Sequence, residues 1–204
     1  MGTPKFAVQT LDILYNDENF DVKLVVSGKD KKRSRNKVTP TEVKKYAIDH
    51  GINVVTPDSV NTEEFVNELE KLNIDFIVVV AFGQLIGSLL LEKCKDKIIN
   101  LHPSILPKYR GAAPMQFTLL NGEKQTSPTT MLIEKGMDSG DILMQEIVDV
   151  DIKDDYYSLE EKMSEYGSKA IRNTLINFDE LYKNRIKQDH DEATFTKKIT
   201  KEMG

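Results

Sequence analysis

Residues 76–80 constrain the fold more than any other segment of the chain. All five are apolar, with no alternation between apolar and polar positions. This pattern is typical of a strand that is buried on both faces of a parallel sheet. A second buried strand is expected at 98–101, after a short helix at 89–94. Strands that alternate with helices predict an α/β fold, a doubly wound, Rossmann-like, mostly parallel sheet with helices on both faces.

The other elements follow from spacing and capping residues. Thr3 and Pro4 are expected to start a first helix, Thr39 and Glu42 form a capping box, and Ser158 and Glu161 form another. Further elements are expected as strands at 22–26, 52–55, 129–133 and 142–150, and as helices at 39–50, 61–72, 112–120 and 158–186, the last with a break near Gly167. The last two strands suggest an added antiparallel edge. Residues 1–187 are therefore expected to form one domain, and the polar residues 188–204, which show no core face, a linker.

Composition narrows the classes of protein. The net charge is −5, so contact with an anionic partner requires a local basic patch. Cys94 is the single cysteine, which excludes an intramolecular disulfide and favours a reducing compartment. The longest apolar stretch, 76–82, is too short to cross a bilayer, and the first residues do not have the pattern of a signal peptide. We expect a soluble protein of the cytosol or of an organelle's interior, with no membrane partner.

Candidate catalytic residues lie where a strand ends. Asn100 and His102 are two positions apart at the end of the strand at 98–101, so their side chains are expected on one side of the sheet. An amide donor beside an imidazole can stabilise a developing oxyanion. From position alone, His102 could equally be a hydrogen-bonded structural histidine. Asp138 lies between Gly136 and Gly140 on a turn between strands, so its carboxylate could reach toward the strand-end residues. Aspartate is also common in turns for purely structural reasons.

A basic run occupies residues 29–37 and includes Arg33, Arg35 and Lys37. Such a run is usually a solvated loop. In an acidic chain and at the same strand-end level as His102, it could also bind an anion. The sequence has no cluster of ligands with metal-binding spacing, so we expect chemistry without a metal.

Together these segments resemble the methionyl-tRNA formyltransferase family over essentially the whole chain. Residues 1–7 are similar to the family's first βα loop, and residues 79–84 to its folate-pocket loop. Asn100, His102 and the following Pro-Ser-Ile-Leu-Pro are similar to the hydrolase/formyltransferase signature, and Asp138 to its distal aspartate. The wider superfamily includes glycinamide ribonucleotide, UDP-amino-sugar and formyl-folate-hydrolysing enzymes, but residues 109–116 are most similar to the tRNA enzymes.

The resemblance implies transfer of a formyl group from 10-formyltetrahydrofolate, as co-substrate, to the α-amino group of initiator methionyl-tRNA. It implies three sets of residues: Asn100, His102 and Asp138 for catalysis; Phe82, Gly83, Gln84, Leu85, Ser104, Ile105, Leu106 and Pro107 for folate; Arg33, Arg35 and Lys37 for tRNA, with Arg35 the best candidate. A monomer in the bacterial cytoplasm is expected.

The sequence departs from the family pattern at three places. Met1 falls where the family's opening strand would end, and residue 204 lies where the family continues into a C-terminal β-barrel domain that helps to bind tRNA. Gly87 stands where a proline is usual, which is expected to loosen one turn. The alternatives are another folate-dependent formyltransferase or formyl-folate hydrolase of the superfamily, a nucleotide-binding module without catalysis, and an inactive truncated fragment.

Overall fold

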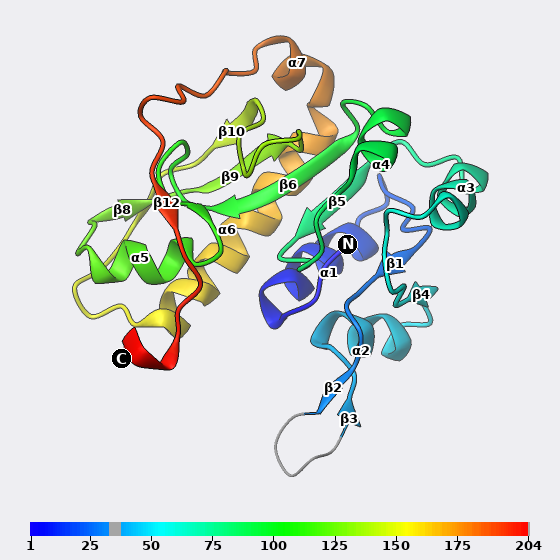
Figure 1. Cartoon of the computed structure of the whole chain (residues 1–204), viewed down its shortest axis with the longest axis horizontal. Coiled ribbons are helices and arrows are strands. Elements are labelled where there is room, and N and C mark those ends of the chain that lie inside the picture. Colours follow the sequence, from blue (N-terminus) through cyan, green and yellow to red (C-terminus); the bar gives the residue numbers. More distant parts are fainter. Residues whose placement is uncertain (33–37, 204) are drawn as a thin grey trace. The chain divides into compact units, whose positions relative to one another are not determined.

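The computed structural model describes residues 1–32 and 38–203, and the chain divides into two compact units (Figure 1). The first unit is Met1–Asn100 and the second is Leu101–Gly204. Strand β6 (Ile98–Pro103) begins in the first unit and ends in the second. The sequence-based expectation of an α/β fold with parallel strands and covering helices is confirmed.

Parallel strands form the centre of the first unit. Strand β1 (Val25–Val26) pairs with β4 (Val54–Val55), and β5 (Ile77–Val80) is hydrogen-bonded to β6. The backbone of Met1 and Gly2 lies between these pairs, because the Gly2 N–H donates to the Val26 carbonyl at 3.0 Å and the Val80 N–H donates to the Met1 carbonyl at 2.9 Å. The backbone groups of Val26 in β1 and Val80 in β5 are therefore hydrogen-bonded to Met1 and Gly2.

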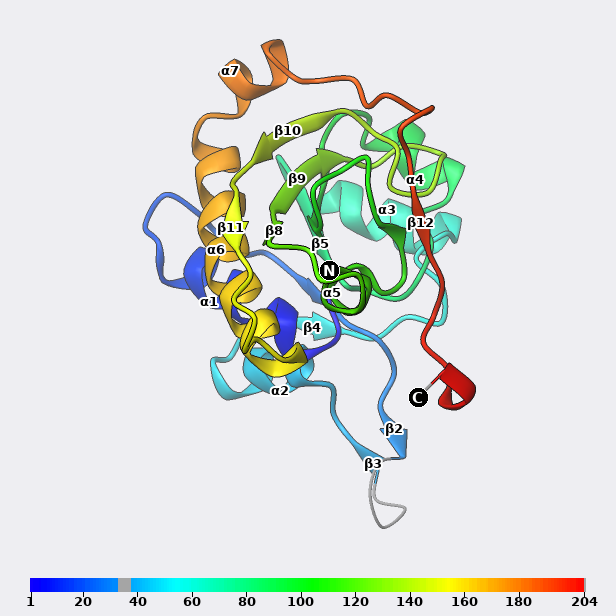
Figure 2. The ribbon, with the colours of Figure 1, turned by 90° about the vertical axis from the view of Figure 1, so that its left-hand side faces the viewer.

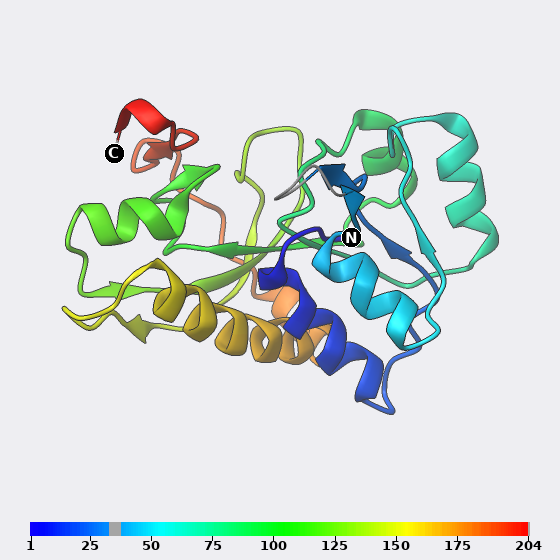
Figure 3. The same ribbon diagram turned by 90° about the horizontal axis from the view of Figure 1, so that it is seen from below.

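The described part of the first unit also has the helical segments η1 (Lys5–Ala7), α1 (Val8–Asn16), α2 (Glu42–Asp49), α3 (Glu63–Lys71) and α4 (Ser88–Lys93). Helices α1 and α2 pack side by side, in dark blue and cyan in Figure 3.

Two predicted caps were wrong. Thr3 does not cap the first helix, because its hydroxyl donates to the Phe82 carbonyl at 2.7 Å. Thr41, rather than Thr39, caps α2 by accepting from the Lys44 N–H.

The second unit combines a mixed sheet with one long helix. Strand β9 (Pro128–Leu132) lies between β6 and β10 (Ile142–Gln145), and β10 is antiparallel to β9, so the predicted antiparallel edge is confirmed. Helix α6 (Tyr156–Ile176) packs on this sheet (Figure 2). The remaining elements of the unit are β7 (Arg110–Gly111), α5 (Pro114–Leu120), β8 (Gln125–Thr126), β11 (Val148–Asp149), α7 (Phe178–Lys183), β12 (Phe195–Thr196) and η3 (Lys201–Met203).

The predicted break near Gly167 was wrong, because α6 runs without interruption to Ile176 and the chain turns at Asn177. A Cβ atom at Gly167 would lie 2.6 Å from Leu101 Cδ2. Gly167 therefore serves close packing of the helix on β6 rather than a kink. The capping box also differs from the prediction, since Asp155 and Ser158 form it.

The segment after residue 186 packs on the second unit, in contrast to the expected linker without a core face. Strand β12 pairs in parallel with β7, with Phe195 opposite Arg110. The side chains of Gln188 and Thr196 are buried. Periodicity could not indicate this packing, because the contacts are made by single polar residues through hydrogen bonds.

The close contact at Gly167 gives a stability prediction. Alanine in a helix interior is normally more stable than glycine by about 1 kcal/mol. Here the added methyl group would meet Leu101, and overpacking of a core costs about 1–3 kcal/mol. We expect Gly167→Ala to lower the free energy of unfolding, measured by urea denaturation. Asn173→Ala, at an exposed position of the same helix, is the control and should raise it by about 0.5 kcal/mol. A Gly167→Ala variant as stable as wild type would contradict the packing argument.

Candidate functional site

The end of β6 carries two of the predicted catalytic residues. Asn100 is half-buried and His102 is 4% exposed, and both belong to this strand. The following loop is held by its own hydrogen bonds, since the Ser104 hydroxyl donates to the Lys108 carbonyl at 2.7 Å. The peptide bond between Leu106 and Pro107 is cis. His102 is therefore placed on a strand end that continues into an internally bonded loop.

Both ring nitrogens of His102 face acceptors. Nε2 lies 2.9 Å from the Tyr109 carbonyl oxygen, and Nδ1 lies 3.6 Å from Asp138 Oδ2. A carbonyl oxygen can only accept, so Nε2 carries a proton. Nδ1 is the ring nitrogen that faces the Asp138 carboxylate. The structure therefore brings together His102 and Asp138, two of the three predicted catalytic residues.

Asp138 is oriented by its backbone and by one peptide group. Its φ of 46° lies in the left-handed region, which aspartate tolerates better than most residues. Its Oδ2 atom accepts a hydrogen bond of 2.8 Å from the Gly111 N–H. This contact and the one to His102 use the same carboxylate oxygen. A small change in the turn that carries Asp138 would therefore alter both contacts.

Two further residues of this site were not predicted. Arg110 is 3% exposed, and its guanidinium donates from Nε and Nη2 to Gln188 Oε1 at 3.0 and 2.6 Å. Burial lowers the pKa of Arg110 below its ordinary value, and the negative charge of Asp138 opposes that shift. Arg110 lies in the segment that carries the family resemblance, but nothing in the sequence of the tail singles out Gln188.

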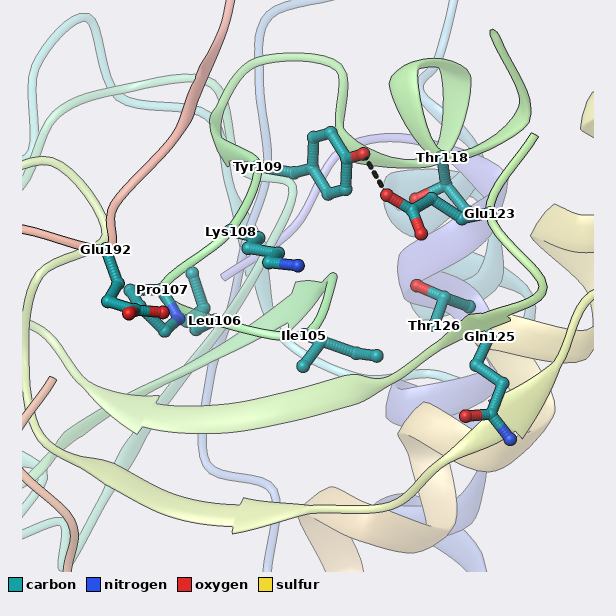
Figure 4. A pocket seen from close by; sticks show the side chains of 10 residues that line it. All are labelled: Ile105, Leu106, Pro107, Lys108, Tyr109, Thr118, Glu123, Gln125, Thr126 and Glu192. Carbon is teal, nitrogen blue, oxygen red and sulfur yellow. Dashed lines mark hydrogen bonds between the residues drawn. The ribbon is translucent and has the colours of Figure 1, made fainter. Parts of the chain in front are cut away.

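A cavity of about 240 Å³ lies beside the loop after β6 (Figure 4). Ile105, Leu106 and Pro107, three of the predicted folate residues, line it. Lys108 extends between them and Tyr109, whose hydroxyl donates to Glu123 at 2.5 Å. Ser104, the fourth predicted folate residue of this loop, is fully buried. Its carbonyl accepts a hydrogen bond of 2.6 Å from the Thr129 hydroxyl. Leu106 also packs in a core cluster with Met131 and Ile142.

The other predicted folate residues belong to the first unit. The Phe82 side chain is buried, whereas Gly83 is exposed with φ of 86°. Gln84 Oε1 accepts from the Val60 N–H at 3.1 Å and its Nε2 donates to the Pro57 carbonyl at 3.2 Å. Leu85 is 84% exposed. The loop is thus held in place by Gln84 and presents an uncovered apolar side chain.

The predicted tRNA residues Arg33, Arg35 and Lys37 lie outside the described residues. The chain on either side of them forms an antiparallel pair, β2 (Lys31–Lys32) with β3 (Val38–Thr39). Within residues 1–32 and 38–203, no group of three or more metal-binding side chains lies together, and no helix is long and apolar enough to cross a membrane.

Comparison with known proteins assigns the chain to a family. The formyl transferase family model matches residues 1–175. The methionyl-tRNA formyltransferase of Finegoldia magna is 45% identical over 203 residues, and that of Caldanaerobacter subterraneus is 43% identical over 206. Both alignments cover 100% of this chain and 66% of the relative. The chain thus spans slightly less than two thirds of the length of these relatives.

Solved structures agree with the fold. The phosphoribosylglycinamide formyltransferase of Bacillus halodurans superimposes with a TM-score of 0.69 at 23% identity, covering 82% of this chain and 87% of that one. A sugar 3N-formyl transferase, solved with dTDP and 5-N-formyl-THF, gives a TM-score of 0.68 at 25% identity, covering 96% of this chain and 67% of that one. With these similarities and a family model that matches most of its length, the chain belongs to the formyl transferase family.

Proposed function

We propose that this chain carries the catalytic part of a methionyl-tRNA formyltransferase. It transfers a formyl group from 10-formyltetrahydrofolate to the α-amino group of initiator methionyl-tRNA. The arrangement of His102 and Asp138, 3.6 Å apart at the end of β6, is the observation that carries the proposal. The choice of acceptor is supported by the names of the relatives, which are 45% and 43% identical over the whole chain.

The proposed reaction is an acyl transfer with balanced proton movement. The α-amine attacks the formyl carbon, so a C–N bond forms and the carbonyl electrons move to the oxygen. The Asn100 amide and protonated His102 stabilise that oxyanion. The bond between the formyl carbon and the folate nitrogen then breaks. The proton lost by the attacking nitrogen reaches the departing folate nitrogen through a water that Asp138 orients.

The contacts of His102 support separate roles for its two ring nitrogens. The proton on Nε2 is held by the Tyr109 carbonyl, so the proton on Nδ1 is the one that His102 can exchange. Asp138 balances the charge of the ring when that proton is present. The carboxylate also stays paired with the Gly111 N–H, which keeps it oriented while the proton moves.

The donor site is proposed at two places that the structure describes separately. In the first unit, the exposed Leu85 and the loop from Phe82 to Gln84 would contact folate. In the second, Ile105, Leu106 and Pro107 line an apolar wall of the cavity, and Ser104 fixes the same loop. Two structural neighbours, a sugar 3N-formyl transferase solved with 5-N-formyl-THF and an N-formyltransferase solved with folinic acid, support a formyl-folate donor.

The acceptor site is proposed at the basic residues Arg33, Arg35 and Lys37. An acidic chain needs a local cluster of cations to attract tRNA phosphates. Two nearby lysines already have acidic partners, Lys29 with Asp58 and Lys44 with Asp30. Of the basic residues of the run, which also include Lys31 and Lys32, Arg33, Arg35 and Lys37 are the proposed contacts, with Arg35 first among them.

We expect Asp138→Asn to lower the rate of formyl transfer by about 100-fold or more, the range measured for lost general acid–base groups. The variant keeps an oxygen that can accept from the Gly111 N–H, so the turn should survive, but it cannot balance a charged His102. The measurement is transfer from 10-formyltetrahydrofolate to methionyl-tRNA, with His102→Ala alongside and circular dichroism of all variants.

Asp141→Asn is the matched control, because Asp141 lies three residues further on and pairs with Arg185 at 2.9 Å. It should keep normal turnover. Near-normal turnover in Asp138→Asn or His102→Ala would refute the catalytic assignment. Glycinamide ribonucleotide and an amino sugar nucleotide, supplied as acceptors in parallel, test the choice of methionyl-tRNA.

A second prediction concerns the donor. Removing a buried leucine side chain from a contact loses about 1.5–3 kcal/mol, and each 1.4 kcal/mol is tenfold in affinity. We therefore expect Leu85→Ala to raise the Kd for 10-formyltetrahydrofolate by about tenfold or more. Because Leu85 is 84% exposed, its truncation should leave the thermal midpoint unchanged.

Ile152→Ala provides the comparison for Leu85→Ala, since Ile152 is 100% exposed and lies outside the proposed donor site. It should change neither the Kd nor the thermal midpoint. If both variants bind the folate like wild type, in a fluorescence or calorimetric titration, Leu85 does not contact the donor.

A further inference from the structure

We propose that Gln188 is a positioning residue for Asp138, and that residues 186–196 belong to the working part of the site. This inference rests on the proposed function of Asp138. Gln188 does not touch the proposed reacting atoms, so it acts through the aspartate. The segment that carries it was expected to be a linker.

The side-chain amide of Gln188 is fully used by hydrogen bonds within the second unit. Its Oε1 accepts twice from Arg110, at 3.0 and 2.6 Å. Its Nε2 donates to the backbone carbonyls of Asp138, at 2.9 Å, and Gly140, at 2.8 Å. Gln188 is 6% exposed, so water does not compete readily for these bonds. One amide thus ties the buried Arg110 to the turn that carries Asp138.

The backbone of Asp138 needs such a tie. Its left-handed φ of 46° is a sparsely populated conformation for a residue other than glycine, and it persists where surrounding contacts hold it. The carboxylate extends from this backbone to the Gly111 N–H and toward His102. Rotation of the turn would therefore move Oδ2 away from both, and a misplacement of about 1 Å in an active site can cost on the order of 100-fold in rate.

Arg110 supplies the second half of the arrangement. Its guanidinium is buried and also lies 3.2 Å from His190 Nδ1, through Nη2. The positive charge of Arg110 interacts with the negative charge of Asp138. Gln188 therefore holds a buried cation on one side and the backbone of the proposed catalytic carboxylate on the other.

The segment around Gln188 is fixed at both ends. Upstream, Ile186 exchanges backbone hydrogen bonds with Ile142, at 2.8 and 2.9 Å. Downstream, Thr194 accepts from the Tyr109 N–H at its hydroxyl and from the Arg110 N–H at its carbonyl. The Thr196 hydroxyl donates to the Arg110 carbonyl at 3.1 Å. This chain of contacts gives Gln188 a defined position relative to Asp138.

A purely structural role would require fewer of the hydrogen bonds of Gln188 than a positioning role. If the residue only satisfied Arg110, any side chain that accepts from the guanidinium would suffice. Gln188→Glu keeps that acceptor, but it replaces the NH2 group by an oxygen that cannot donate to the carbonyls of Asp138 and Gly140. Gln188→Met fills similar volume and removes both functions. The pair of variants therefore separates the two roles.

The experiment measures kcat and KM for formyl transfer in the full chain and in both variants. Lys187→Gln, at an exposed neighbouring position, is the control. We expect both Gln188 variants to lower kcat by about 10- to 100-fold with KM for the two substrates unchanged. Lys187→Gln should match wild type.

A second readout does not depend on activity. Hydrogen exchange of the Gly111 amide reports its bond to Asp138 Oδ2. Both Gln188 variants should exchange this amide faster than wild type, while Lys187→Gln should not. If Gln188→Met fails to fold, Gln188→Glu alone carries the test.

The outcomes separate the two proposals. A Gln188→Glu variant with wild-type kcat and a protected Gly111 amide overturns the positioning role. Absence of formyl transfer in the wild-type chain counts against the proposed function. The rate of hydrogen exchange at the Gly111 amide then tests the positioning role of Gln188 by itself.

Discussion

The hydrogen bond from the Gly111 N–H to the Asp138 carboxylate is the contact on which the arrangement of the second unit depends. It joins the loop after β6 to the turn between β9 and β10. Gly111 has φ of 105°, and a Cβ at this position would lie 2.5 Å from the Thr196 carbonyl oxygen. A side chain there would separate β7 from β12. Three distant segments thus meet at one peptide group, which requires glycine both for its conformation and for the close approach of the tail.

Arg110 shows why the tail has to be polar where it packs. A guanidinium removed from water needs hydrogen-bond partners and compensating charge, or its burial is strongly unfavourable. Gln188 accepts from it and Asp138 supplies the opposite charge. A buried polar network of this kind specifies one arrangement, because each member is satisfied only when the others are in place. The same bonds that make the buried cation tolerable therefore also fix the position of the proposed catalytic carboxylate.

Features that depend on residues close together in sequence could be predicted, whereas features that depend on contacts between distant residues could not. Residues 77–80 form the expected buried strand because their own apolar pattern requires it, and α2 ends before Gly51, as expected from a glycine at a helix end. The break expected near Gly167 failed because the reason for that glycine is Leu101, far away in sequence. Asn100 and His102 were candidates from their position at a strand end, and the resemblance to a family favoured catalysis over structural roles for His102 and Asp138. Their catalytic role stays a prediction. Gln188 has no such signal, since four hydrogen bonds to distant groups define its role.

Gly87 illustrates how a departure from a family pattern is accommodated locally. Its N–H donates to Asn61 Oδ1 at 2.5 Å, a bond that proline at this position could not make. A Cβ at Gly87 would lie 2.7 Å from the same oxygen. Asn61 Nδ2 in turn donates to the Leu85 carbonyl at 2.9 Å. The side chain of Asn61 therefore forms hydrogen bonds with the backbone of both Leu85 and Gly87. A loosened turn was expected from the loss of proline. In this chain the two hydrogen bonds of Asn61 connect the turn at Gly87 to the Leu85 carbonyl.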